Sequence, residues 1–144
     1  NALAKWPNQE PASDLIQIAS DKKNPNKNSA LDAYISIASK AKNPTEAYQK
    51  ALLLDESKNS LKRILAGMGQ FGGKDAIDII EPYLTDKVTR DEAASALTSI
   101  ARRIKNSNRV IALETVNKIL NSGASSSAKI EAAKLNSEMN LYQD

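Results

Sequence analysis

The sequence predicts an all-α protein of 144 residues, built as a right-handed superhelix of about four stacked helix pairs. Three observations predict it: a long internal repeat, apolar residues at helical spacing, and a lack of strand patterns. Self-similarity over tens of residues is typical of stacked repeat proteins. β-Branched residues do not alternate with polar ones, and neither Asn-Gly nor Asp-Gly, the usual hairpin turns, occurs.

The repeat joins two blocks of sequence. Residues 3–21 recur without a gap as residues 68–86, and residues 30–38 recur as residues 93–101. In the first block, Leu3, Trp6, Ala12, Leu15, Ile18, Ala19 and Asp21 match Met68, Phe71, Ile77, Ile80, Tyr83, Leu84 and Asp86. In the second block, Ala30, Leu31, Tyr34, Ile37 and Ala38 match Ala93, Ala94, Leu97, Ile100 and Ala101. We therefore expect the aromatic residues of the repeat, Trp6, Tyr34, Phe71 and Tyr83, to lie in the core.

The first four predicted helices span residues 12–21, 27–41, 44–55 and 58–70, after the last turn of another helix at residues 2–6. The turn Asn24-Pro25 separates the first two. The third helix opens with Asn43 as cap, Pro44 in the first turn and Glu46 behind it. The fourth carries its apolar residues at helical spacing, namely Leu61, Ile64, Leu65 and Met68.

The other four predicted helices span residues 74–85, 89–105, 107–121 and 126–141. Gly72-Gly73 precedes the fifth, and Pro82 inside it should kink it. Thr89 and Glu92 fit a capping box at the start of the sixth. Gly123 is expected to end the seventh in a left-handed conformation. We interpret residues 1–144 as a single domain and as a fragment of a longer chain.

Composition excludes several classes of site. The chain has no cysteine and no histidine, which excludes Ser-His-Asp triads, cysteine nucleophiles and Cys/His zinc sites. No apolar run is long enough to span a bilayer, and Asn1 opens directly into folded-looking sequence, so we expect neither a membrane span nor a signal peptide. The net charge of +3 is mild for a dedicated nucleic-acid binder.

The helix pairs resemble HEAT repeats. The resemblance is carried by residues 76–84 with Asp86, followed by the Ala-rich residues 91–101. More narrowly, residues 2–7, 66–69 and 80–84 are similar to the repeat segment of exported Bacteroidetes and Planctomycetes proteins that carry a 3-keto-disaccharide hydrolase (DUF1080) domain. The resemblance implies a HEAT/ARM-like scaffold, a periplasmic or extracellular location, and no catalytic residue or cofactor in this segment.

The acidic pairs and the glycine-rich stretch can both be explained by structural roles. The carboxylates Asp55-Glu56, Asp75 with Asp78, and Asp91-Glu92 all lie at expected helix ends, where acidic residues act as caps. The stretch 67–73 is rich in glycine but follows no strand and lacks the Lys-Ser/Thr of a phosphate loop. We interpret Gly67 and Gly69 as sites where a neighbouring helix comes close.

The sequence leaves two functions open. The first is a non-catalytic module that binds another protein or an adjoining domain through the second helices of each pair. The expected face comprises Asp32, Ser36, Ser39, Lys62, Gln70, Ser95, Thr98, Ser99 and Arg102. The alternative is binding of a nucleic-acid phosphate backbone, at the basic patch Arg102, Arg103, Lys105 and Arg109, with Lys58, Lys62 and Arg63 as a second cluster.

The nucleic-acid reading is the weaker of the two, because acidic residues are interspersed and aromatic residues for base stacking are few. Exposed apolar surface at the ends of the stack makes a homodimer a further expectation. Tyr48 and Tyr142 have no repeat partner and fit either a surface contact or helix packing.

Overall fold

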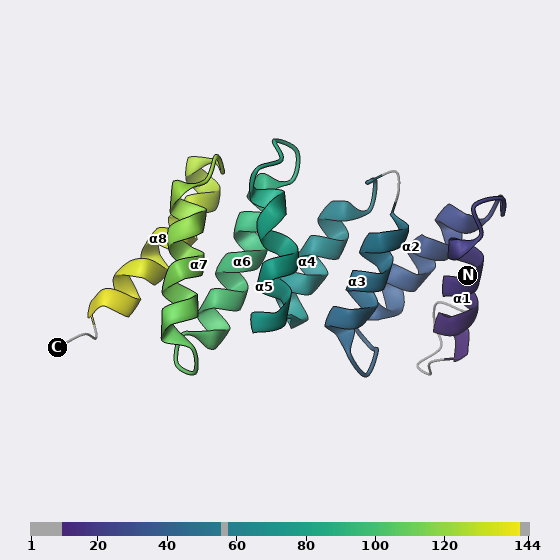
Figure 1. Cartoon of the computed structure of the whole chain (residues 1–144), viewed down its shortest axis with the longest axis horizontal. Helices are drawn as coiled ribbons and strands as arrows, with labels where there is room; N and C mark the ends of the chain where they lie inside the picture. The colour runs from purple at the N-terminus through teal and green to yellow at the C-terminus, as the bar shows by residue number, and fades with distance from the viewer. Residues whose placement is uncertain (1–9, 56–57, 142–144) are drawn as a thin grey trace. The chain divides into compact units, whose positions relative to one another are not determined.

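In a computed structural model, residues 10–55 and 58–141 are described, and every regular element in those ranges is helical (Figure 1). All eight predicted helices from residue 12 onward are found there, so the all-α prediction is confirmed. The helix expected at residues 2–6 lies outside the described ranges. The α-helices are α1 (Glu10–Ser20), α2 (Lys27–Ala38), α3 (Pro44–Leu54), α4 (Leu61–Phe71), α5 (Lys74–Ile80), α6 (Arg90–Ile104), α7 (Arg109–Asn121) and α8 (Ser126–Leu141), and a 3₁₀ helix η2 (Glu81–Leu84) follows α5.

The chain divides into two compact units, and the division falls between Gly67 and Met68, within α4. We call the described residues up to Gly67 the first unit and those from Met68 onward the second unit, and describe each by itself. The expected single domain stays a prediction.

The first unit is built around α2, which packs against both α1 and α3. A helix covered on more than one side must be apolar on more than one face. In α2 the buried residues accordingly spread around the helix: Ala30, Leu31, Ala33, Tyr34, Ile35, Ile37 and Ala38. Tyr48 of α3 is also buried, with 6% of its surface exposed, so it packs between helices and makes no surface contact.

The start of α3 confirms the predicted cap. The side chain of Asn43 accepts a hydrogen bond from the backbone N–H of Glu46 at 3.2 Å, and Pro44 opens the helix. Proline suits this position because its missing N–H would have no helical partner there. The start of α4 differs from the prediction: Lys58 adopts a left-handed backbone with φ of 58°, and the helix begins at Leu61.

The second unit is built around α6, which packs against α5, η2, α7 and α8. Successive helices from α6 to α8 are joined by short turns at alternating ends (Figure 1). Many of the buried residues of α6 are alanines, whose small side chains allow close packing. These buried residues are Ala93, Ala94, Ala96, Leu97, Thr98, Ile100, Ala101 and Ile104.

Proline ends α5 early. Pro82 has no N–H to donate to the carbonyl four residues back, and its ring clashes with a continuing helix. The chain therefore leaves the α-helix at Ile80 and tightens into η2, where a helix over 74–85 with a kink had been expected.

Part of the internal repeat is also a repeat of burial, although Ala12 is half-buried where its match Ile77 is buried. Leu15 in α1 and its match Ile80 at the end of α5 are 1% and 0% exposed. Ala19 and its match Leu84 are both buried, as are all five matched pairs between α2 and α6. These matched positions therefore belong to the core of each unit.

Three local predictions have a different outcome. Among the expected core aromatics, Tyr34 is buried and Tyr83 is half-buried, but Phe71 is 40% exposed. Trp6 lies outside the described residues. The capping box is wrong, because the Thr89 hydroxyl donates to the carbonyl of Tyr83 and makes no cap bond. The left-handed stop is also wrong, because no described glycine has a positive φ.

Candidate interaction faces

The predicted partner face is largely solvent-exposed within each unit. In the first unit Asp32, Ser36 and Lys62 are exposed and Ser39 is half-buried. In the second unit Gln70, Ser95 and Arg102 are exposed and Ser99 is half-buried. Thr98 is a correction to the prediction: it is 4% exposed, and its hydroxyl donates to the Ala94 carbonyl at 2.8 Å. A threonine at this position satisfies its hydroxyl against its own helix and packs inward.

In the first unit, Asp32 joins α2 to α4. Its carboxylate accepts from the Arg63 guanidinium at 3.3 Å and from the Ser60 hydroxyl at 3.3 Å. The other terminal nitrogen of Arg63 reaches the Ser36 hydroxyl at 3.5 Å. Two residues of the expected face are therefore engaged with a cation, and Arg63 is not a free phosphate ligand.

Ser39 belongs to the packing of Tyr48. The Ser39 side chain is hydrogen-bonded to the Tyr48 phenol. Burial raises the pKa of the Tyr48 phenol above its ordinary value, although nearby Arg63 and the Ser39 bond oppose that rise. The same region explains Gly67, because a Cβ there would overlap the Tyr48 ring.

The predicted basic patch in the second unit is a set of links between helices. Arg102 pairs with Glu131 at 3.2 Å, and Lys105 pairs with Glu138 at 3.2 Å, so both join α6 to α8. Arg109 of α7 donates to the backbone carbonyl of Met139. These cations are close together in the sequence. Their acceptors lie about 30 residues further along the chain, and the sequence did not predict them.

Arg103 makes the most extensive of these links. Its guanidinium donates to the carbonyls of Gln70 at 2.8 Å, of Gly69 at 2.6 Å, and of Gly72. Burial lowers the pKa of this guanidinium. The last carbonyls of a helix lack intrahelical partners, so Arg103 of α6 caps the C-terminus of α4.

The carboxylates and glycines also have structural partners. Asp55 accepts from the backbone N–H of Ser60 at 2.9 Å, and Asp91 from that of Ser125 at 2.8 Å. Asp75 accepts from the N–H of Gly73 at 3.2 Å. Glu56 lies outside the described residues. A Cβ on Gly69 would lie 2.6 Å from the Ala96 Cα, so a neighbouring helix does come close, as predicted.

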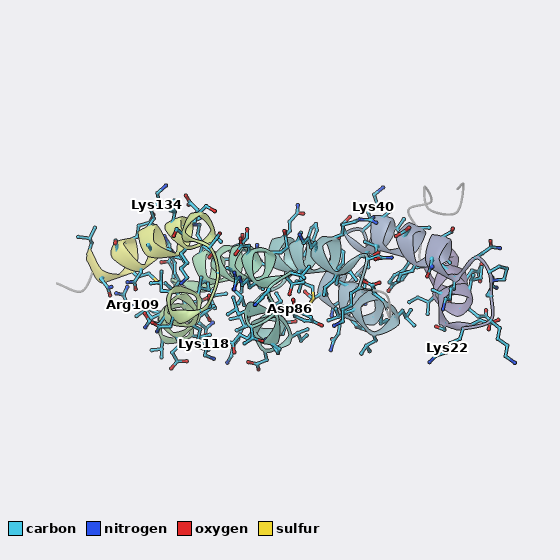
Figure 2. The ribbon with its side chains drawn as sticks, turned by 90° about the horizontal axis from the view of Figure 1, so that it is seen from above. Lys22, Lys40, Asp86, Arg109, Lys118 and Lys134 are labelled. Carbon is cyan, nitrogen blue, oxygen red and sulfur yellow. The ribbon has the colours of Figure 1, made fainter. Side chains whose placement is uncertain are left out.

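The second unit has two separate charged sides. Lys118 of α7 and Lys134 of α8 point to opposite sides of the unit (Figure 2). Lys118 pairs with Glu81 of η2 at 2.9 Å, and this hydrogen bond raises its pKa. Lys134 pairs with Glu131, and the bonds from Lys134 and Arg102 lower the pKa of that carboxyl group. Each side thus carries paired charges.

None of the described helices is both long enough and apolar enough to cross a membrane. In the described ranges, no three acidic residues gather closely enough to hold a metal ion. No protein-family model matches the chain, and neither a curated protein nor a solved structure matches it.

Proposed function

We propose that the chain is a non-catalytic scaffold of HEAT-like helix pairs, arranged as a right-handed superhelix, that binds another protein or an adjoining domain. The observation that supports this proposal is the chemistry of the exposed side chains and the pairing of the cations. The exposed side chains of the predicted face include Ser36 on α2, Gln70 on α4 and Ser95 on α6, and the cations of the basic patch already have oxygen acceptors within the second unit.

Such faces suit a protein better than a polyanion. A phosphate backbone is bound by cations that exchange small counterions for phosphates. Arg103 and Arg109 would first have to release backbone carbonyls, and Arg102 and Lys105 would have to release carboxylates. A protein partner can instead hydrogen-bond to exposed serines and glutamine without breaking these links.

The resemblance to exported proteins with a 3-keto-disaccharide hydrolase domain supports a more specific form of the proposal. In that form the scaffold belongs to an exported protein and holds a sugar-directed enzyme domain of the same chain.

Residues 1–144 contain no cysteine, so a single cysteine can be placed on a chosen helix face of this segment. Ser95→Cys on the exposed face of α6 would be labelled with a photoactivatable maleimide in the full-length protein, with any cysteine outside residues 1–144 changed to serine. The matched control is Glu114→Cys, on an exposed position of α7. We expect Ser95→Cys to cross-link to a sequence outside residues 1–144 and Glu114→Cys to do so much less. Equal labelling from both positions would show that the α6 face is not the binding face.

The nucleic-acid alternative is tested separately. Fluorescence anisotropy of a labelled DNA duplex at low salt should show no binding up to high micromolar protein. Micromolar binding that falls steeply with added salt, and that is lost when Arg102 and Lys105 are both changed to Gln, would overturn the scaffold proposal in favour of phosphate binding.

A further inference from the structure

The second unit contains a groove of about 580 Å³ that the repeat reasoning did not foresee. It lies between η2, α7 and the turn before α8, with the first residue of α6 at its edge. Six of its lining residues carry the argument: Glu81, Arg90, Asn117, Lys118, Asn121 and Gly123. None of them belongs to the predicted partner face, so this inference does not rest on the proposed function.

Arg90 is the distinctive residue of the groove. Its side chain is half-buried, yet its guanidinium has no hydrogen-bond acceptor and no ion-pair partner within the described ranges. Arginine carries five N–H donors in a planar fork that matches a carboxylate. The other arginines of this unit differ, because Arg102, Arg103 and Arg109 all donate to oxygens of the protein.

Gly123 makes room for Arg90. The backbone of Gly123 does not need glycine, because its φ is not positive. A Cβ at this position would lie 3.0 Å from a terminal nitrogen of Arg90 and 3.8 Å from the central guanidinium carbon. The turn that holds Gly123 is itself anchored, since Ser125 donates to Asp91 at 2.8 Å and Ala124 donates to the Ser122 hydroxyl at 3.2 Å. The guanidinium thus lies against a firmly held backbone that carries no side chain.

The charges of the groove define its ligand. Glu81 and Lys118 neutralise each other, because both oxygens of Glu81 lie 2.9 Å from the lysine nitrogen. Among the lining residues the charge of Arg90 remains, while Asp78 and Glu114 also lie near Lys118. Asn117 and Asn121 lie one helical turn apart on α7 and add amide groups that both donate and accept hydrogen bonds.

We propose that this groove binds a ligand with a single carboxylate next to neutral hydrogen-bonding groups. The carboxylate would take the fork of Arg90, and the neutral groups would face Asn117 and Asn121. The volume is in the range of small-molecule sites and exceeds what a lone carboxylate would fill. A sugar acid and an acidic peptide both offer this chemistry.

The test is an NMR titration of the isotope-labelled 144-residue chain with two probes, sodium glucuronate and the peptide acetyl-Gly-Glu-Gly-amide. Glucose and the peptide with Gln in place of Glu serve as uncharged controls. We expect at least one charged probe to shift the amide signals around Gly123, Asn117 and Asn121 with millimolar affinity, and its uncharged counterpart to shift them little. The probe that binds identifies the source of the carboxylate.

Three variants locate the site. Arg90→Gln should weaken binding about tenfold, as expected for loss of a charge-assisted pair. Gly123→Ala retains the charge but displaces the guanidinium, and it should weaken binding several-fold while the helical circular dichroism stays unchanged. Arg102→Gln removes an equal charge from the same helix and should leave the affinity as it was.

Several outcomes would overturn the proposal. One is that neither charged probe shifts these signals at 50 mM. Another is that the uncharged controls bind equally well. A third is that Gly123→Ala binds like the unaltered chain. A fourth is that Arg90→Gln and Arg102→Gln weaken binding equally, because the effect would then be one of overall charge.

Discussion

Replacing Arg103 by Met tests the idea that the basic patch is a structural device. Methionine retains most of the apolar length of the side chain but removes the guanidinium. The variant loses three hydrogen bonds from Arg103 to the carbonyls of Gly69, Gln70 and Gly72 at the end of α4. The matched control is Arg102→Met, the next residue of α6, which loses only an exposed ion pair with Glu131.

The two variants should differ clearly in stability. A hydrogen bond from a charged donor contributes about 1.5–3 kcal/mol, and a cation at a helix C-terminus adds about 0.3–1 kcal/mol. Water can replace part of this, because the bond to Gln70 is exposed and those to Gly69 and Gly72 are only part-buried. We therefore expect Arg103→Met to lower the free energy of unfolding by about 2–3 kcal/mol. Arg102→Met should lower it by about 1 kcal/mol or less, as is usual for exposed ion pairs.

The assay is urea unfolding followed by circular dichroism at pH 7, with amide hydrogen exchange as a local readout. The midpoint of Arg103→Met should fall without a change in slope, and the Gly72 amide, which donates to the Met68 carbonyl, should exchange faster. If the two variants agree within about 0.5 kcal/mol, a typical effect for a surface substitution, Arg103 does not cap α4 and the structural reading of the patch fails.

Three further predictions concern caps, close packing and pH. Asn43→Ala should cost about 1 kcal/mol in urea unfolding, since it removes the cap of α3, and Asn43→Ser should restore most of it. Gly69→Ala should lower the unfolding free energy by about 1–3 kcal/mol despite its better helix propensity, because the new Cβ meets the Ala96 backbone; an unchanged or raised midpoint would contradict this contact. Burial raises the pKa of Tyr34 and Tyr48, so their contribution to the free energy of unfolding is fully present below the unfolded pKa of about 10 and is lost as the pH rises further. The urea midpoint should therefore fall between about pH 9 and pH 11, and it should fall less when both tyrosines are changed to Phe.

The helices were predictable because their signals are local. Apolar spacing placed α2, α4 and α6, and the cap at Asn43 placed the start of α3. Errors occurred where two local rules compete. At Pro82 the ring forced a 3₁₀ turn, and at Thr89 the hydroxyl found a carbonyl six residues back in place of a cap partner.

The exposure of the predicted interaction residues was harder to predict, because it depends on which helices pack beside them. Thr98 lies on the same helix as the exposed Ser95 but faces the packed side. Phe71 matched a repeat of buried positions, yet it lies at the end of α4 and is 40% exposed. The groove at Arg90 has no continuous sequence motif, because its lining comes from η2, α6, α7 and a turn.

By itself, the sequence determined that this protein is helical and roughly where its helices lie, because hydrophobic periodicity and caps act within a few residues. Only the tertiary structure decided the roles of the charges. Arg102, Arg103 and Lys105 read as one basic cluster along the chain, but each has its acceptor about 30 residues away, on a helix that lies beside α6. Arg90 reads as an ordinary helix start and has no acceptor within the described ranges. The physical reason is that a cation's role depends on the oxygens that packing brings within about 3 Å, and sequence neighbours do not define them.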